Sequence, residues 1–412
     1  MKEKPVIEII SLLIIIVLLC VLLFHYSTDS FREIDVFVFF QYSENIWNGL
    51  VPYRDFVVEF PPVSLVFYCV PHLLSSDSES YVIAFAAMVA ALSVLTYLVS
   101  LGLLKEMDCD RYQKIIFTVV YIILLNFYFP NLAGKFDMAV VFLTVLGIYL
   151  FVKGYRIPAY VIVTVAMLTK FYPGLVLLLF LLMDCKKEYE PRAVFERLAI
   201  IVLAVFACLL PVLIWGAGLD QILSCITFHS NRGFQVESSV AVIVQFLGDF
   251  GIGSYSIAEH YHTYDVVSPA TDFLSPFWTY VVIGLILGGY VFIWHHLSTR
   301  GAPDNTRDLT ERMSRYFLLL LLLFLLTNKV FSTQYIVWIL PWFVLNGLGT
   351  SRFYAIAYAV MYALIVILSK QTGSELFSTF FMIRLMLLVT GLILLIRMLM
   401  IDRTVGDEAV SC

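Results

Sequence analysis

Apolar runs long enough to lie across a lipid bilayer dominate this chain. A helix of about 20 apolar residues crosses the hydrocarbon core. Only 14% of the 412 residues are charged, against roughly 25% in soluble domains. The sequence therefore predicts an all-α polytopic membrane protein with about twelve transmembrane helices, near residues 6–26, 81–104, 115–130, 137–152, 157–169, 172–183, 198–215, 277–297, 315–327, 333–348, 353–369 and 379–400.

Several runs are not ordinary spans. Those at 157–169, 172–183 and 315–327 are short, so they either form half-spans or extend into polar mouths that line a cavity. The run PPVSLVFYCVPHLL, residues 61–74, is too short to cross and has proline near each end. We expect it to form a re-entrant or interfacial helix. The first run is too long for a signal peptide, and no A-x-A-like cleavage site follows it.

Basic residues set the predicted orientation. With the N-terminus in the cytoplasm, 18 of the 26 Lys and Arg fall on the inner side, whereas the acidic residues divide almost evenly. This bias follows the positive-inside rule. We expect a single membrane domain over residues 1–412 with both termini in the cytoplasm. The first external loop spans 27–80, the large external loop 216–276 and the cytoplasmic tail 401–412.

Polar side chains recur where the outer ends of the spans should lie. Asp35 opens the first external loop, Lys135 and Asp137 stand at the mouth of the fourth span, and Lys170 lies in a two-residue outer connection. A single external Asp is ordinarily solvated, and a single Lys at a span end is often a snorkelling anchor. Several such residues at one membrane level instead indicate a shared polar cavity that is open to the outside and borders lipid.

Such a cavity suits transfer of a sugar from a lipid carrier. Cytoplasmic nucleotide sugars do not reach the outer side, but a sugar on polyprenyl phosphate does. The reaction needs a carboxylate that takes the proton from an acceptor hydroxyl. It also needs Lys, Arg or His to stabilise the departing phosphate. The outer loops contain both kinds of residue.

Four blocks of the sequence resemble a known superfamily. IDVFVFFQYSENIWNGLVPYRDFVVEFPPVS resembles the first external loop of GT-C glycosyltransferases, in which an Asp, a G-x-x-P-Y turn and a PP helix follow the first span. GKFDMAVVF with the later KFYP resembles the next block. FHSNRGFQVESS and NKVFSTQYIVWILPW look like later blocks of glycosyltransferase family 87, the polyprenol-phosphate-mannose-dependent α-mannosyltransferases. The resemblance runs in order from about residue 28 to 345.

The resemblance implies roles for individual residues. Asp35 takes the position of the catalytic base, and an inverting displacement would move a hexose, with mannose implied, to a glycan, glycolipid or glycoprotein acceptor. Asp137 matches a position that helps to bind a metal in some branches, but no second carboxylate adjoins it, so a divalent metal is unsupported. The candidates for binding the donor phosphate are Arg232, Lys329, Lys170 and His229. The candidates for binding the sugar or acceptor are Glu59, Asp137, Glu237, Tyr53 and Gln334.

Other readings remain open from the residues alone. Tyr53 and Trp47 fit interfacial anchors as well as sugar-stacking rings. A multi-pass transporter or flippase of a sugar or lipid-linked sugar would also be polytopic, although transporters bind substrate near the midplane. A sugar-lipid ligase or polymerase would share the enzyme class. Cys69 and Cys225 are the two cysteines expected outside, and a disulfide between them is left open.

Composition and layout also bear on partners and location. There is no basic patch or motif for nucleic acid. The partners expected are the polyprenyl-phosphate-linked donor, the acceptor and the bilayer. No organelle address, large soluble domain or long tail is seen, which fits a prokaryotic cell membrane, archaeal or bacterial. An endoplasmic reticulum protein would have the equivalent lumenal topology.

The orientation leads to a labelling prediction. In a background without native cysteines, we expect Asp55→Cys to react with a membrane-impermeant thiol reagent added to intact cells, because position 55 lies in the first external loop. Labelling that appears only after the membrane is permeabilised would reverse the predicted orientation.

Overall fold

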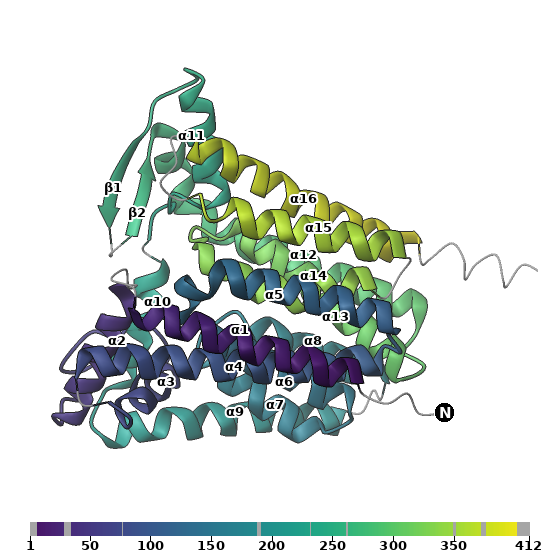
Figure 1. Cartoon of the computed structure of the whole chain (residues 1–412), viewed down its shortest axis with the longest axis horizontal. Coiled ribbons are helices and arrows are strands. Elements are labelled where there is room, and N and C mark those ends of the chain that lie inside the picture. Colours follow the sequence, from purple (N-terminus) through teal and green to yellow (C-terminus); the bar gives the residue numbers. More distant parts are fainter. Residues whose placement is uncertain are drawn as a thin grey trace, which may run out of the picture. The chain divides into compact units, whose positions relative to one another are not determined.

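The computed structural model is mainly helical. It describes residues 6–28, 34–75, 77–187, 191–230, 232–260, 263–348, 352–371 and 376–401. These residues form sixteen α-helices, one 3-10 helix and one two-stranded sheet, labelled in Figure 1. Contacts divide the chain into unit 1, Met1–His229 with Asn305–Thr310, and unit 2, Ser230–Asp304 with Glu311–Cys412. The predicted all-α polytopic class is confirmed, and the single membrane domain stays a prediction.

Unit 1 contains ten helices within the described residues. They are α1 (Val6–Thr28), α2 (Ile34–Trp47), α3 (Ser64–His72), α4 (Ser78–Glu106), α5 (Arg111–Ala133), α6 (Asp137–Val152), α7 (Arg156–Met167), α8 (Gly174–Lys187), α9 (Pro191–Ile214) and α10 (Leu219–Ser230).

Unit 2 combines helices with a hairpin. Its elements are α11 (Ser239–Asp249), β1 (Ser256–His260), β2 (Thr263–Val267), α12 (Pro269–Arg300), α13 (Thr306–Thr327, from Glu311 onward), the 3-10 helix η1 (Thr333–Tyr335), α14 (Ile336–Leu348), α15 (Arg352–Leu368) and α16 (Phe377–Ile401).

Each of the twelve predicted apolar runs contains a helix. Six of these helices are long and apolar enough to cross a membrane, namely α1, α4, α5, α9, α12 and α16. The others are shorter or carry more charge, as α7 with 12 residues illustrates. The run at 61–74 forms α3, whose nine residues rise only about 14 Å and cannot cross a bilayer.

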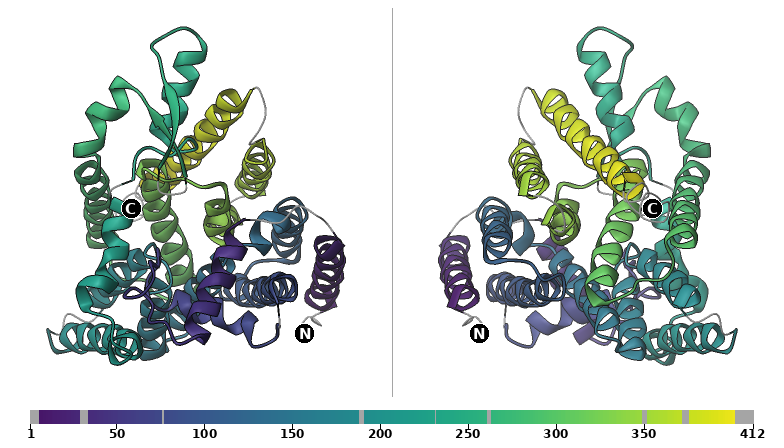
Figure 2. Two further views of the ribbon diagram at one scale, coloured as in Figure 1. Left: turned by 90° about the vertical axis from the view of Figure 1, so that its left-hand side faces the viewer. Right: turned by 90° about the vertical axis from the view of Figure 1, so that its right-hand side faces the viewer.

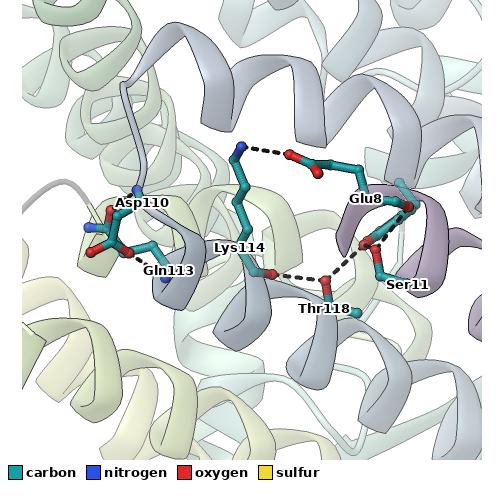
Figure 3. Close-up of polar contacts among 7 residues, drawn as sticks. Glu8, Ser11, Asp110, Gln113, Lys114 and Thr118 are labelled. Carbon is teal, nitrogen blue, oxygen red and sulfur yellow. Dashed lines mark hydrogen bonds and ion pairs between the residues drawn. The ribbon is translucent and has the colours of Figure 1, made fainter. Parts of the chain in front are cut away.

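Polar contacts hold the first helix of unit 1 in place. Helices α1, α4 and α5 run side by side (Figure 1). The buried hydroxyl of Tyr97 lies 2.7 Å from Ser11 Oγ and 2.8 Å from Thr118 Oγ1, which joins all three helices. Lys114 Nζ donates to Glu8 Oε1 at 2.7 Å, beside the capping box of Asp110 and Gln113 that begins α5 (Figure 3). This network fixes the register of α1 against its neighbours.

The middle of unit 1 is packed with apolar side chains. Helix α6 lies against α7 where Gly147 faces Val163, and a Cβ on Gly147 would come within 2.3 Å of Val163 Cγ2. The rings of Phe151 and Phe180 stack 4.0 Å apart between α6 and α8. Since this layer is packed with apolar side chains, the charged side chains of unit 1 lie toward the ends of its helices.

The hairpin in unit 2 was not predicted. Strands β1 and β2 pair antiparallel inside the loop expected at 216–276, and both views of Figure 2 show them beside α11. Strand β2 also exchanges backbone hydrogen bonds with the segment 232–238, through Val236 N to Tyr264 O and Val266 N to Phe234 O. These non-local contacts stabilise a hairpin that local sequence pattern does not indicate.

The segment 232–238 is held on its other side as well. Gln235 N donates to Lys329 O at 2.9 Å, and Gln235 Oε1 accepts from Phe331 N at 3.1 Å. Within this segment, Phe234 packs with Ala241 and Val266 in a small apolar core. Three stretches that are distant in sequence therefore form one hydrogen-bonded layer in unit 2.

Cys69 and Cys225 of unit 1 are free thiols, so the disulfide that the sequence left open is not formed.

Candidate functional site

Asp35 forms an ion pair with a lysine 100 residues away. Lys135 Nζ donates to Asp35 Oδ2 at 2.5 Å, and the lysine side chain is 16% exposed while that of the aspartate is 47% exposed. Asp35 lies in the first turn of α2 and Lys135 in the turn between α5 and α6. The carboxylate therefore has a fixed cation on one oxygen and solvent access at the rest of the group.

Aromatic packing orients the helix that carries Asp35. Phe39, one turn further along α2, stacks on Tyr68 with centroids 4.6 Å apart and meets Phe136 edge-on at 5.6 Å. The ring centroids of Tyr42 and Tyr68 are 5.8 Å apart. Asp35, Phe39 and Tyr42 therefore share one face of α2, and the two rings pack this face against Tyr68 of α3.

A second carboxylate–ammonium pair lies in the same unit. Lys170 Nζ is 2.9 Å from Asp137 Oδ1, and the side chains are only 10% and 2% exposed. The ammonium also lies over the rings of Phe60 and Phe136, at 5.4 and 5.5 Å from their centroids. Asp137 begins α6, where the helix dipole favours a negative charge. Buried charges are tolerated when they are paired in this way.

The first external loop supplies further side chains near Asp35. Burial raises the pKa of the Tyr42 hydroxyl, and the negative charges of the half-buried Glu59 and of Asp35 raise this pKa further. Tyr53 is buried, has a φ of 68° and donates from its hydroxyl to Phe60 O at 2.6 Å. Tyr53 thus has a structural partner, and its role with a sugar stays a prediction, as does that of the exposed Trp47.

Two of the predicted phosphate-binding cations lie in unit 2 beside one buried carboxylate. Arg232 is 7% exposed, and Lys329 Nζ donates to Ser275 Oγ at 3.0 Å. Burial lowers the pKa of Lys329, and the negative charge of Asp265 partly offsets this. Asp265, 2% exposed on β2, interacts with Arg232 also. The backbone layer of unit 2 therefore brings both cations to the same acidic group.

Glu237 is held by an arginine from the C-terminal helix. Arg384 Nη1 lies 3.3 Å from Glu237 Oε2, and Nη2 donates to Glu237 O at 2.7 Å. The guanidinium carbon lies over the rings of Phe331 and Phe381, 4.5 and 4.0 Å from their centroids. Thr333 donates to the same carboxylate. Glu237 thereby ties the segment 232–238 to α16.

The remaining candidates have fewer described contacts. Gln334 is half-buried in η1. His229 falls where side chains lie outside the described residues, so its predicted role stays a prediction. Within the described ranges, no three His, Cys, Asp or Glu side chains gather as a metal-binding group.

Three charged partners were given no individual role from the sequence: Lys135, which was placed only among the residues of a polar cavity, Asp265 and Arg384. Lys135 stands two residues before Asp137 and could have been found by pairing every cation at the outer span ends with a carboxylate. Asp265 lies in an unpredicted hairpin. Arg384 lies in an otherwise apolar span, and a charge in such a place is itself a signal of a buried partner.

Unit 1 is helical and contains two carboxylate–ammonium pairs, Asp35 with Lys135 and Asp137 with Lys170. Unit 2 contains two cations, Arg232 and Lys329, that interact with the buried Asp265 carboxylate. A comparison with family models matches residues 58–326 to the model of glycosyltransferase family 87, and the chain belongs to that family. A search of curated proteins found no match.

Family membership distinguishes between the readings left open by the sequence. It makes the protein a membrane glycosyltransferase, and the transporter reading loses its support. The matched residues include Lys135, Asp137, Lys170 and Arg232 and begin after Asp35. The sugar, the donor, the acceptor and the base are therefore matters for proposal.

The two ion pairs of unit 1 should differ in their effect on stability. We expect Lys170→Met to lower the free energy of unfolding by about 3 kcal/mol or more, because it removes the ammonium from the buried Asp137 carboxylate. The matched Lys135→Met should cost about 1 kcal/mol or less, because Asp35 is half exposed. The measurement is the thermal unfolding midpoint of the purified protein in detergent.

A double variant completes this test. Asp137→Asn with Lys170→Met should regain much of the stability lost by Lys170→Met alone, since no uncompensated buried charge remains. Equal losses for Lys170→Met and Lys135→Met would contradict the buried character of the Asp137–Lys170 pair.

Proposed function

We propose that this glycosyltransferase moves a hexose, specifically mannose, from a polyprenyl-phosphate donor to a glycan or glycolipid acceptor on the extracytoplasmic side. The observation that supports it most is the Asp35–Lys135 pair, a carboxylate oriented by a cation and still open to solvent. Family membership supports the sugar-transfer chemistry. Mannose and the lipid-linked donor rest on the resemblance of the outer loops to polyprenol-phosphate-mannose enzymes.

Asp35 would act as the general base. Because Lys135 donates to Oδ2, Oδ1 remains for an acceptor hydroxyl. As that hydroxyl oxygen forms a bond to the anomeric carbon, its proton passes to the carboxylate. A positioned base of this kind contributes about 10²- to 10⁴-fold to the rate.

The departing group would be polyprenyl phosphate. The bond between the anomeric carbon and the phosphate oxygen breaks, and the electron pair leaves with the phosphate, whose charge rises from one to two negative units. Arg232 and Lys329 are the cations proposed to stabilise this charge, with Arg232 ranked first because its guanidinium can bind two oxygens at once. Lys170 is the weakest candidate of the three, since its ammonium contacts Asp137.

Attack from the face opposite the phosphate inverts the anomeric centre. A β-linked donor then yields an α-linked product in a single displacement. Glu59, Asp137, Glu237 and Gln334 are proposed to bind sugar or acceptor hydroxyls, and no metal is assigned a step. A sugar-lipid ligase or polymerase is the second candidate, and it would use the same base with a lipid-linked glycan in place of the monosaccharide.

Orientation and location complete the proposal. Both termini are proposed to lie in the cytoplasm and the reaction to occur outside, in an archaeal or bacterial cell membrane. The excess of Lys and Arg in the predicted inner loops supports this orientation.

Replacing the base tests the proposal. Asp35→Asn keeps the size of the side chain and removes the proton acceptor, so transfer of labelled mannose from polyprenyl-phosphate mannose should fall at least about 100-fold. The assay uses purified membranes and counts label in the acceptor fraction.

Glu44→Gln is the matched control, because Glu44 is exposed on the same helix and its substitution removes the same charge as Asp35→Asn. It should transfer at nearly the wild-type rate. Full activity in Asp35→Asn would disprove its role as base and turn attention to Asp137, Glu59 and Glu237.

A further inference from the structure

Helix α11 and the turn after it direct a row of large apolar side chains outward. Ile243, Leu247 and Phe250 recur at intervals of four and three residues, so they lie on one side of the helix and its end. They are 42%, 38% and 69% exposed, whereas Gln245 on the other side is buried. Ile252, in the turn, is 64% exposed. Exposed apolar side chains that gather in this way are typical of a protein or membrane contact.

The end of α11 holds Phe250 and Ile252 on a fixed backbone. Ile252 N donates to Leu247 O at 2.9 Å. Gly251 N donates to Gly248 O at 2.9 Å, and Gly251 has a φ of 78°. This pair of hydrogen bonds is a Schellman motif, in which glycine takes a left-handed conformation that larger residues rarely adopt. The two apolar side chains are therefore presented by an ordered turn.

The patch carries almost no charge. Asp249 is the only charged residue in the stretch 238–258, which contains no Lys or Arg. Its carboxylate accepts from the hydroxyl of Tyr255 at 2.9 Å and from that of Ser378. Two hydroxyls therefore offset part of the cost of moving this one charge toward lipid. No cation of the stretch is available to bind an anionic headgroup.

The contact with Ser378 gives the level of the patch relative to a membrane span of the same unit. Ser378 lies in the first turn of α16, a candidate span of 25 residues. Such a helix rises about 38 Å, slightly more than the hydrocarbon core of about 30 Å. The end of α11 thus lies beside the end of a span, where the bilayer surface is expected. Figure 1 shows α11 and the turn after it at the edge of unit 2.

The neighbouring helix continues this apolar surface. Helix α12, another candidate span of unit 2, packs against α11 and exposes Phe273 and Phe277 to 72% and 60%. Side chains of this kind on a membrane span face lipid. The patch on α11 is therefore continuous with a surface that lipid covers.

We propose that Ile243, Leu247, Phe250 and Ile252 form an interfacial membrane anchor, which inserts into the lipid leaflet beside the first turn of α16. Because the patch is apolar and without cations, it binds the acyl region of the bilayer rather than a charged headgroup. Helix α11 follows the segment 232–238 directly, so the anchor holds that segment at the lipid surface. This interaction goes beyond the proposed transfer reaction and does not depend on its donor or base.

Depth measurements by spin labelling test the anchor. Ile252→Cys is made in the full-length protein without native cysteines, spin-labelled and reconstituted into phosphatidylcholine nanodiscs. We expect lipid-soluble oxygen to reach the label more readily than a water-soluble nickel chelate does. The label should lie about 5–10 Å into the boundary between headgroups and acyl chains. Glu259→Cys is the matched control, because Glu259 is exposed on β1 and its label should lie in water.

Lipid charge and a second substitution sharpen the test. Anionic phosphatidylglycerol added to the nanodiscs should leave the depth at position 252 unchanged, because apolar side chains make the contact. Phe250→Asp combined with Ile252→Cys should move the label toward water, since an uncompensated carboxylate is costly in lipid. If Ile252→Cys does not fold, as judged by gel filtration, Phe250→Cys carries the depth measurement.

Three results would overturn the inference. The first is a label at position 252 that the nickel chelate reaches as readily as it does at position 259. The second is a label that neither reagent reaches, because protein would then cover the patch. The third is a depth that appears only when anionic lipid is present. None of these results bears on the proposed transfer reaction, because the measurement uses no donor or acceptor.

Discussion

The contact between Lys135 and Asp35 is the interaction on which the functional account depends. It joins the turn after α5 to the first turn of α2, and so it connects the helical body of unit 1 to the loop that follows the first helix. Without a fixed partner, the half-exposed side chain of an aspartate in the first turn of a helix would sample several rotamers. With one oxygen held by an ammonium and Phe39 packed one turn further along α2, the carboxylate has the restricted orientation that the proposed proton transfer needs.

Pairing of a carboxylate with a cation recurs within each of the two units. Asp137 is matched by Lys170, Glu237 by Arg384, and Asp265 by Arg232 and Lys329. In a chain with 14% charged residues, each buried carboxylate requires a nearby cation because desolvation is costly. The pairs differ in how far their carboxylates are exposed. Asp137 is enclosed, whereas nearly half of the Asp35 side chain remains accessible.

Sequence patterns predicted the helices well and the partnerships poorly. Every long apolar run proved helical because helix is the backbone conformation that satisfies its own hydrogen bonds in lipid. The proline-flanked run at 61–74 formed a short helix, as expected. The hairpin of β1 and β2 was missed because it depends on pairing with the segment 232–238, which local propensity cannot reveal. Likewise, Arg384 lies 147 residues from Glu237, a separation that no periodicity encodes.

The site predictions show the same division. Asp35, Lys170 and Asp137 could be named because their positions at span ends are local facts. The contacts of Lys170 with Asp137 and of Lys135 with Asp35 belong to the tertiary structure, and they change the role that each lysine can be given. A lysine proposed to bind phosphate is engaged by a buried carboxylate, and a lysine passed over in the site prediction orients the proposed base.

The stereochemistry of the product tests the central claim most directly. Transfer from synthetic β-linked polyprenyl-phosphate mannose, with the product's anomeric configuration read by NMR from the one-bond carbon–hydrogen coupling, requires no mutation and reports on donor and mechanism together. A single displacement assisted by Asp35 predicts an α-linked product. A β-linked product would contradict the account, because retention requires a second carboxylate as nucleophile about 5 Å from the first.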